Sequence, residues 1–167
     1  MKNKLNINLE VSLVEIIFSI LIFAIAGAIM LNSFIIARFT QIKTNDKVEA
    51  LSIVQSQAEM IKYFKSTDEM FEYLSGSFNY NETSENKNIF VNYYDKYWNL
   101  CNKKDNEFTV TVQISDIPFI YGEIKEINII SKKTKEYPII DKNKEDEKNI
   151  IFKINTKKFF PNNEGRW

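Results

Sequence analysis

The chain has 167 residues, enough for one modest domain together with a membrane segment. Its 22 basic and 22 acidic residues balance, so its net charge directs it toward neither nucleic acid nor an acidic partner. The sequence contains no histidine and one cysteine, Cys101, which excludes an intramolecular disulfide, histidine-based catalytic triads and the usual zinc sites. We interpret Cys101 as a small buried apolar residue, the alternatives being an intermolecular bridge or a reactive thiol.

The N-terminal part of the chain carries the strongest signal. Residues 1–10 form a short polar leader with two lysines, and residues 16–37 contain no charged side chain. As a helix, these roughly 22 residues would cover about 33 Å, enough to cross a hydrocarbon core of about 30 Å. A cleaved secretory signal would be shorter and would end at small residues, whereas Arg38 follows here. We therefore predict a transmembrane helix over residues 11–37, lying in the lipid bilayer.

One carboxylate, Glu15, stands at the start of this apolar run. A charge within the hydrocarbon costs on the order of 2.5–3.5 kcal/mol, so an ionisable residue there suggests a function. The alternative is that Glu15 lies at the level of the lipid headgroups, where the cost is small.

Residues 11–15, Val-Ser-Leu-Val-Glu, resemble the N-terminus of the type IV prepilins and their pseudopilin relatives. That family has a short basic leader, then a hydrophobic residue, Thr or Ser, Leu, an aliphatic residue and Glu, and then an apolar helix. The resemblance in motif covers residues 8–37. It implies processing between Glu10 and Val11, and an assembly role for Glu15, whose carboxylate would lie near the free amine of a neighbouring subunit.

Two positions depart from the family pattern. Glu10 occupies the place of the usual glycine before the cut, so the chain is either processed there or remains an uncut membrane protein. Asn32 stands where major pilins often have a helix-kinking proline, which points to a minor pilin or a pseudopilin.

The helix is expected to continue through residues 38–65, which neither Gly nor Pro interrupts. Apolar residues spaced by three, four and three predict one buried face that packs under a sheet, with Val48 extending it backward. These residues are Leu51, Val54, Ala58 and Ile61.

A second, short helix is predicted to begin at Ser66, which with Glu69 forms a capping box, and to end at Gly76. Residues 76–88 are polar and are interpreted as a loop. The C-terminal half predicts strands over residues 89–94, 97–101, 108–114, 124–131 and 150–154. Apolar and polar residues alternate in 108–114 and 150–154 and less regularly in 124–131, whereas 89–94 is a run of branched and aromatic residues that a turn at residues 95–96 returns into 97–101.

We therefore expect an α+β fold, in which a long N-terminal helix packs on a small antiparallel sheet. Its parts are the leader (1–10), the transmembrane half of the helix (11–37), the amphipathic half (38–65) and a globular head (66–167). Residues 142–148 form a solvated charged loop, whereas three aromatic residues near the C-terminus either complete the core or mark a contact surface. They are Phe159, Phe160 and Trp167.

The resemblance implies a structural subunit of a type IV pilus, competence or type II-like secretion filament. Its partners would be other pilin subunits, a membrane platform protein and a prepilin peptidase, with the head outside the cytoplasm and no cofactor. The alternative is a single-pass anchored binding or accessory protein that does not assemble. Carboxylates formally allow a hydrolase, but the sequence has no glycine-rich phosphate loop and no metal-ligand cluster, so we expect no enzyme.

Overall fold

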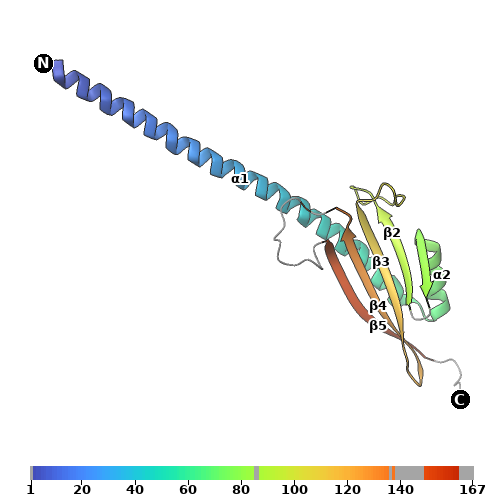
Figure 1. Cartoon of the computed structure of the whole chain (residues 1–167). Coiled ribbons are helices and arrows are strands. Elements are labelled where there is room, and N and C mark those ends of the chain that lie inside the picture. Colours follow the sequence, from blue (N-terminus) through green and yellow to red (C-terminus); the bar gives the residue numbers. More distant parts are fainter. Residues whose placement is uncertain (1, 85–86, 136, 138–148, 162–167) are drawn as a thin grey trace. The chain divides into compact units, whose positions relative to one another are not determined.

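The computed structural model describes residues 2–84, 87–135, 137 and 149–161 (Figure 1). The chain divides into two compact units, Met1–Lys43 and Thr44–Trp167. The second unit has its own hydrophobic core, and we call it the head.

Helix α1, Lys2–Tyr63, is longer than predicted at its N-terminus, because the leader is helical as well. Its two parts differ in burial, as the sequence pattern requires. The large apolar side chains between Leu13 and Ile36 are at least half exposed, whereas α1 within the head buries one face.

The strands form one antiparallel sheet in the order β1-β2-β3-β4-β5. Each strand pairs with its neighbours in sequence, so the order in space is the order in the chain. The strands are β1 Tyr80–Ser84, β2 Lys87–Tyr94, β3 Phe108–Ile117, β4 Gly122–Lys133 and β5 Ile150–Pro161. The long helix packed on this antiparallel sheet confirms the predicted α+β class and has a pilin-like architecture.

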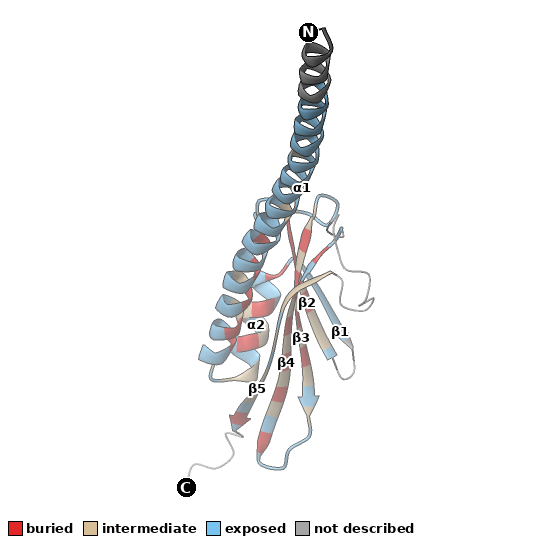
Figure 2. Ribbon diagram, turned by 90° about the vertical axis from the view of Figure 1, so that its left-hand side faces the viewer, coloured by how far each residue is buried: buried red, intermediate tan, exposed pale blue. Residues whose placement is uncertain are grey.

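The core lies between the sheet and the two helices (Figure 2). Alternation in β3 turns one set of side chains inward, and the opposite residues of β4 add Ile127 and Ile129. The inward residues of β3 are Phe108, Val110, Val112 and Ile114. Met70 and Leu74 of α2, Thr67–Ser77, close the core from the helical side.

The buried face of α1 differs from the predicted one by about one residue. Val54, Ala58 and Ile61 are buried, but Leu51 is 38% exposed and Ala50 is buried instead. At about 100° per residue, Ala50 lies closer than Leu51 to the centre of the face that Val54 and Ile61 define. The prediction for Leu51, like that for the more exposed Val48, was therefore wrong.

Half of the capping box predicted for α2 is present, because Glu69 bonds back to Lys65 rather than to the N-cap Ser66. The Ser66 hydroxyl accepts the Glu69 N–H at 3.2 Å, while the Glu69 carboxylate accepts the N–H of Lys65 at 3.4 Å. The helix ends at Ser77 and is followed by the extended Phe78, so Gly76 does not form a left-handed stop.

Two predictions about the sheet were wrong. The polar stretch after Gly76 contains β1, an edge strand that pairs with β2, rather than a loop throughout. Residues 97–101 do not form a strand, because the Asp95 carboxylate accepts the N–H groups of Tyr97 and Asn99 and holds a turn. Trp98 occupies the left-handed region there, with φ 64°.

The C-terminal aromatic residues have different positions. Phe160 is buried in the core, whereas Phe159 is 48% exposed and packs edge-on against Phe119. The predictions for Trp167 and for the loop at residues 142–148 lie outside the described residues.

Candidate functional site

The candidate site is the exposed apolar segment of α1. Between residues 13 and 37 the chain carries one charged side chain, Glu15. The helix is long and apolar enough to cross a membrane by length and composition, and none of the apolar stretch is buried within the protein. A soluble chain would not leave so many large apolar side chains in water, so this segment is compatible with a transmembrane helix.

The hydroxyls in this segment are satisfied by the helix itself. Ser19 Oγ donates to the Glu15 carbonyl at 2.9 Å, and Ser33 Oγ donates to the Ile29 carbonyl at 2.9 Å. Such bonds to the preceding turn allow serine to enter a membrane without an unpaired donor. Among the described side chains, Glu15 has no such hydrogen-bond partner, because a carboxylate accepts hydrogen bonds and the backbone N–H groups around it are used by the helix.

The predicted processing site lies within α1. The helix runs through Glu10 and Val11, and their side chains lie outside the described residues. The backbone therefore has no change of secondary structure between the leader and the apolar segment.

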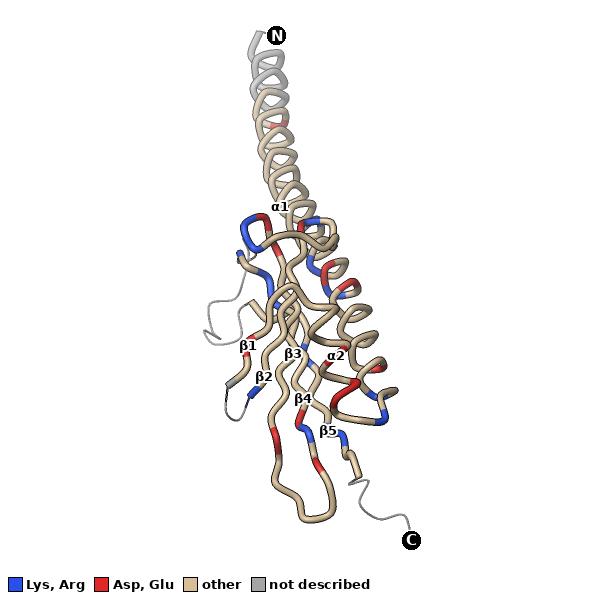
Figure 3. The backbone as a smooth tube through the Cα atoms, turned by 90° about the vertical axis from the view of Figure 1, so that its right-hand side faces the viewer, with Lys and Arg blue, Asp and Glu red and all other residues tan. Residues whose placement is uncertain are grey.

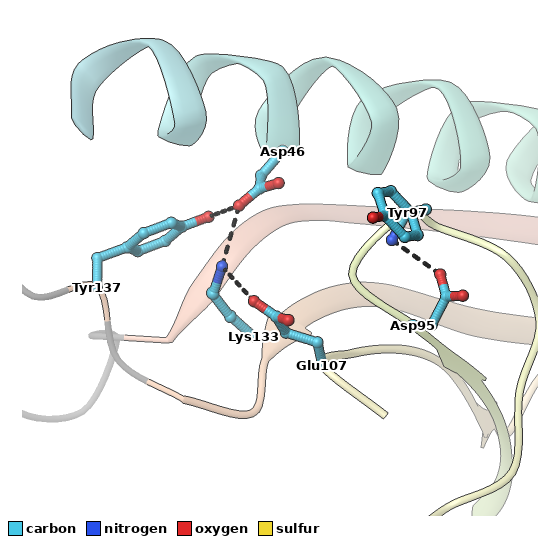
Figure 4. A network of polar contacts seen from close by, with 6 residues as sticks. All are labelled: Asp46, Asp95, Tyr97, Glu107, Lys133 and Tyr137. Carbon is cyan, nitrogen blue, oxygen red and sulfur yellow. Dashed lines mark hydrogen bonds and ion pairs between the residues drawn. The ribbon is translucent and has the colours of Figure 1, made fainter. Parts of the chain in front are cut away.

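A buried polar cluster, which we call the Lys133 cluster, holds α1 on the sheet within the head (Figure 4). The Lys133 ammonium lies 3.2 Å from the Asp46 carboxylate of α1 and 3.1 Å from the Glu107 carboxylate. The Tyr137 hydroxyl donates to Asp46 at 2.7 Å, and the ring faces of Phe108 and Tyr137 both lie within 5 Å of the ammonium. Burial, reinforced by the Asp46 hydrogen bond, holds the pKa of Tyr137 well above its ordinary value.

Two further lysines fix the other end of the head. Lys158 Nζ donates to the carbonyls of Ile61 and Lys62, which are free acceptors in the last turn of α1, and to that of Phe64 just beyond it. Desolvation lowers the pKa of Lys158. Its neighbour in the sheet, Lys125, lies 2.8 Å from Asp116 and 3.0 Å from Glu123.

The pKa of Lys125 reflects two opposing effects. Burial lowers it, but the hydrogen bonds to Asp116 and Glu123 outweigh burial and raise the pKa above its ordinary value. Hydrogen bonds from Lys125 and Thr67 lower the pKa of the Glu123 carboxyl in turn. The ion pairs of Lys125 thus join β3 and β4, and the Thr67 hydroxyl, which donates to Glu123, ties the start of α2 to the sheet.

Sequence reasoning missed all three inward-facing lysines. Lys125 and Lys133 have the same parity along β4 as the buried Ile127 and Ile129, which is the signal that could have found them. The side chain of Cys101, predicted to be buried, is partly exposed. Among the described residues, no group of three or more histidine, cysteine or acidic side chains is placed to bind a metal ion.

The chain matches no family model, and neither a curated protein nor a solved structure is significantly similar to it. What the protein does must therefore be inferred from its own residues.

Proposed function

We propose that this protein is a structural subunit, a minor pilin or pseudopilin, of a type IV pilus, competence or type II-like secretion filament. The observation that carries the proposal is Glu15, a lone carboxylate at the start of an exposed apolar helix. Residues 11–15 also fit the prepilin frame, and the same helix continues into an α+β head.

In this function the apolar segment of α1 holds the subunit in the bilayer, with the head outside the cytoplasm. Cleavage after Glu10 would give Val11 a free α-amine. In the lipid-dissolved subunit, the charge of Glu15 costs on the order of 2.5–3.5 kcal/mol. Pairing with the amine of a neighbouring subunit relieves that cost, because a buried charge is tolerated when it is paired. Assembly is thereby favoured in the one axial register of neighbouring helices that brings Glu15 to the amine of Val11.

The proposed partners follow from this mechanism. Other pilin subunits contact the helix, a membrane platform protein passes the subunit from the bilayer to the filament, and a prepilin peptidase removes the leader. In this function the Lys133 cluster would hold α1 against the sheet under load, since it contacts α1 at Asp46, two residues after the head begins at Thr44.

A second candidate is an anchored accessory protein that never assembles. Glu10 favours it, because it stands where the peptidase usually meets glycine. An uncut leader would also extend α1 by the residues from Lys2 to Glu10 and would obstruct close packing of neighbouring helices.

The N-terminus of the protein distinguishes the two candidates. We would co-express the chain with a prepilin peptidase and determine the intact mass and N-terminal sequence. A filament subunit should begin at Val11, and the matched variant Glu10→Gly should increase the processed fraction. An intact Met1 in the wild type, with processing restored by Glu10→Gly, would favour the anchored accessory protein. An intact Met1 in both would contradict the prepilin interpretation.

A further inference from the structure

Five exposed lysines lie in segments at one end of the sheet. Figure 3 marks the basic and acidic positions along the backbone. Two segments bring them together: the β2–β3 connection and the end of β4. The Glu107 N–H donates to the Tyr94 carbonyl, and the Thr134 N–H donates to the Glu107 carbonyl, both at 2.8 Å, so the two segments lie side by side. We call this surface the basic end of the head. Its lysines are Lys96, Lys103, Lys104, Lys132 and Lys135.

The carboxylates of this end offset part of that charge. Asp46 and Glu107 are engaged by the buried Lys133. Asp95 lies within its own turn, where it accepts the N–H groups of residues 97 and 99. Asp105 is exposed. The five exposed lysines therefore outweigh the two carboxylates outside the Lys133 cluster and the one negative charge that remains in the cluster, so the described part of this surface stays basic.

Two large apolar side chains accompany the lysines. Tyr97 is 70% exposed and Leu100 is 60% exposed, and both lie in the β2–β3 connection between Lys96 and Lys103. Tyrosine with an apolar neighbour and flanking lysines is the composition of segments that lie at the surface of an anionic bilayer.

The chain enters the head at this same end. Asp46 contacts Lys133 at the end of β4, and Thr44 begins the head two residues before it. The uncharged stretch of α1 ends at Ala37, nine residues before Asp46 along the chain. A membrane that holds the apolar segment is therefore within short reach of the basic end along the chain.

We propose that the basic end of the head docks on anionic phospholipid headgroups while the subunit is held in the bilayer. The inference rests on the membrane anchorage under the proposed function and adds a second, electrostatic contact to it. Each lysine near an anionic surface shifts the ratio of docked to undocked heads by about fivefold, and salt weakens the effect. Tyr97 and Leu100 would enter the headgroup layer between the lysines.

The test places a fluorophore on the full-length chain in nanodiscs. In a Cys101→Ser background, Leu100→Cys labels the basic end, and Ile120→Cys labels the β3–β4 connection at the other end of the sheet. The nanodiscs contain phosphatidylcholine alone or equal parts of phosphatidylcholine and phosphatidylglycerol, each with a nitroxide-headgroup lipid that quenches at contact range.

We expect strong quenching at position 100 in the anionic discs at low salt, and weak quenching in neutral discs, at high salt and at position 120. Neutralising three lysines of the connection should lower the docked-to-undocked ratio by about a hundredfold. Those changes are Lys96→Gln, Lys103→Gln and Lys104→Gln. The matched control neutralises three exposed lysines elsewhere and should leave the quenching unchanged. Those changes are Lys62→Gln, Lys65→Gln and Lys157→Gln.

Equal quenching at position 100 in neutral and anionic discs, unaffected by the three neutralised lysines, would overturn the docking proposal and leave the anchorage standing. Failure of the chain to remain in either kind of disc would overturn the anchorage, and the docking with it.

Discussion

Replacing Lys133 by methionine should destabilise the head by about 3–5 kcal/mol, the cost of removing one partner from a buried ion pair. Lys133 is 9% exposed, and its ammonium lies within 3.2 Å of the Asp46 and Glu107 carboxylates. Methionine keeps most of the apolar stem of the lysine. It leaves the Asp46 carboxylate, which is 8% exposed and accepts from the Tyr137 hydroxyl, without its cation.

The partner change, Asp46→Asn, should cost less, about 1–3 kcal/mol. Lys133 keeps Glu107, and the amide oxygen of asparagine can still accept from Tyr137. The double variant removes the opposed charges together, so its cost should be smaller than the sum of the single costs by about 1–3 kcal/mol.

Urea unfolding of the full chain in detergent micelles, followed by tryptophan fluorescence, measures these differences. Trp98, one of the two tryptophans, stacks on Phe108 at 4.2 Å, and Phe108 faces the Lys133 ammonium, so the Trp98 part of the signal reports the surroundings of the cluster. The exposed neighbour provides the control, since Lys132→Met should change the stability by less than about 0.5 kcal/mol. A similarly small effect of Lys133→Met, or additive single variants, would refute the view that the cluster clamps α1 to the sheet.

Three further predictions follow from the packing of the head. Gly122→Ala should destabilise the head by about 1–3 kcal/mol in the same urea assay, because the added Cβ would overlap the Phe160 carbonyl oxygen. Gly76→Ala has open space around it and should stabilise helix α2 by up to about 1 kcal/mol. Equal effects of the two substitutions on stability would contradict this geometry. The raised pKa of Tyr137 means that the folded protein holds the hydroxyl proton more tightly than the unfolded chain does. The free energy of unfolding should therefore fall as the pH rises above about 10, and it should fall less steeply in Tyr137→Phe. Parallel pH profiles of the two proteins would refute this. A fragment of residues 38–167 should be soluble and folded, with mixed helix and strand circular dichroism, because the core lies entirely within the head; a disordered fragment would contradict an independent head.

The sequence was sufficient for the fold class because its two periodicities are strong. The alternation from Phe108 to Ile114 and the three-four spacing of Val54, Ala58 and Ile61 both come from burial of one face, which is a local property of strands and helices. Leu51 was wrongly assigned to the buried face because helical spacing leaves the centre of that face uncertain by about one residue. Ala50, which is buried in its place, is small and weakly hydrophobic, so the apolar pattern did not mark it.

The remaining errors come from specific contacts that the residue pattern of a single element does not encode. Strand β1 is a polar edge strand that forms by pairing with β2, so its own residues carry no strand pattern. The turn after β2 depends on the Asp95 side chain, which overrides the aromatic residues that favoured a strand. Lys133 meets Asp46 across 87 residues of chain, and such a pair becomes visible when the sheet register is known.

The role of Glu15 in assembly is the central claim, and filament incorporation of Glu15→Ala tests it most directly. Wild type, Glu15→Ala and the control Ser19→Ala would be expressed with the assembly machinery, and their amounts in the membrane and in sheared filaments compared. We predict equal membrane levels for all three, with at least about a tenfold loss of Glu15→Ala from the filaments, since losing even 1.4 kcal/mol of pairing energy lowers an equilibrium tenfold. Normal incorporation of Glu15→Ala would contradict the claim that this carboxylate directs assembly.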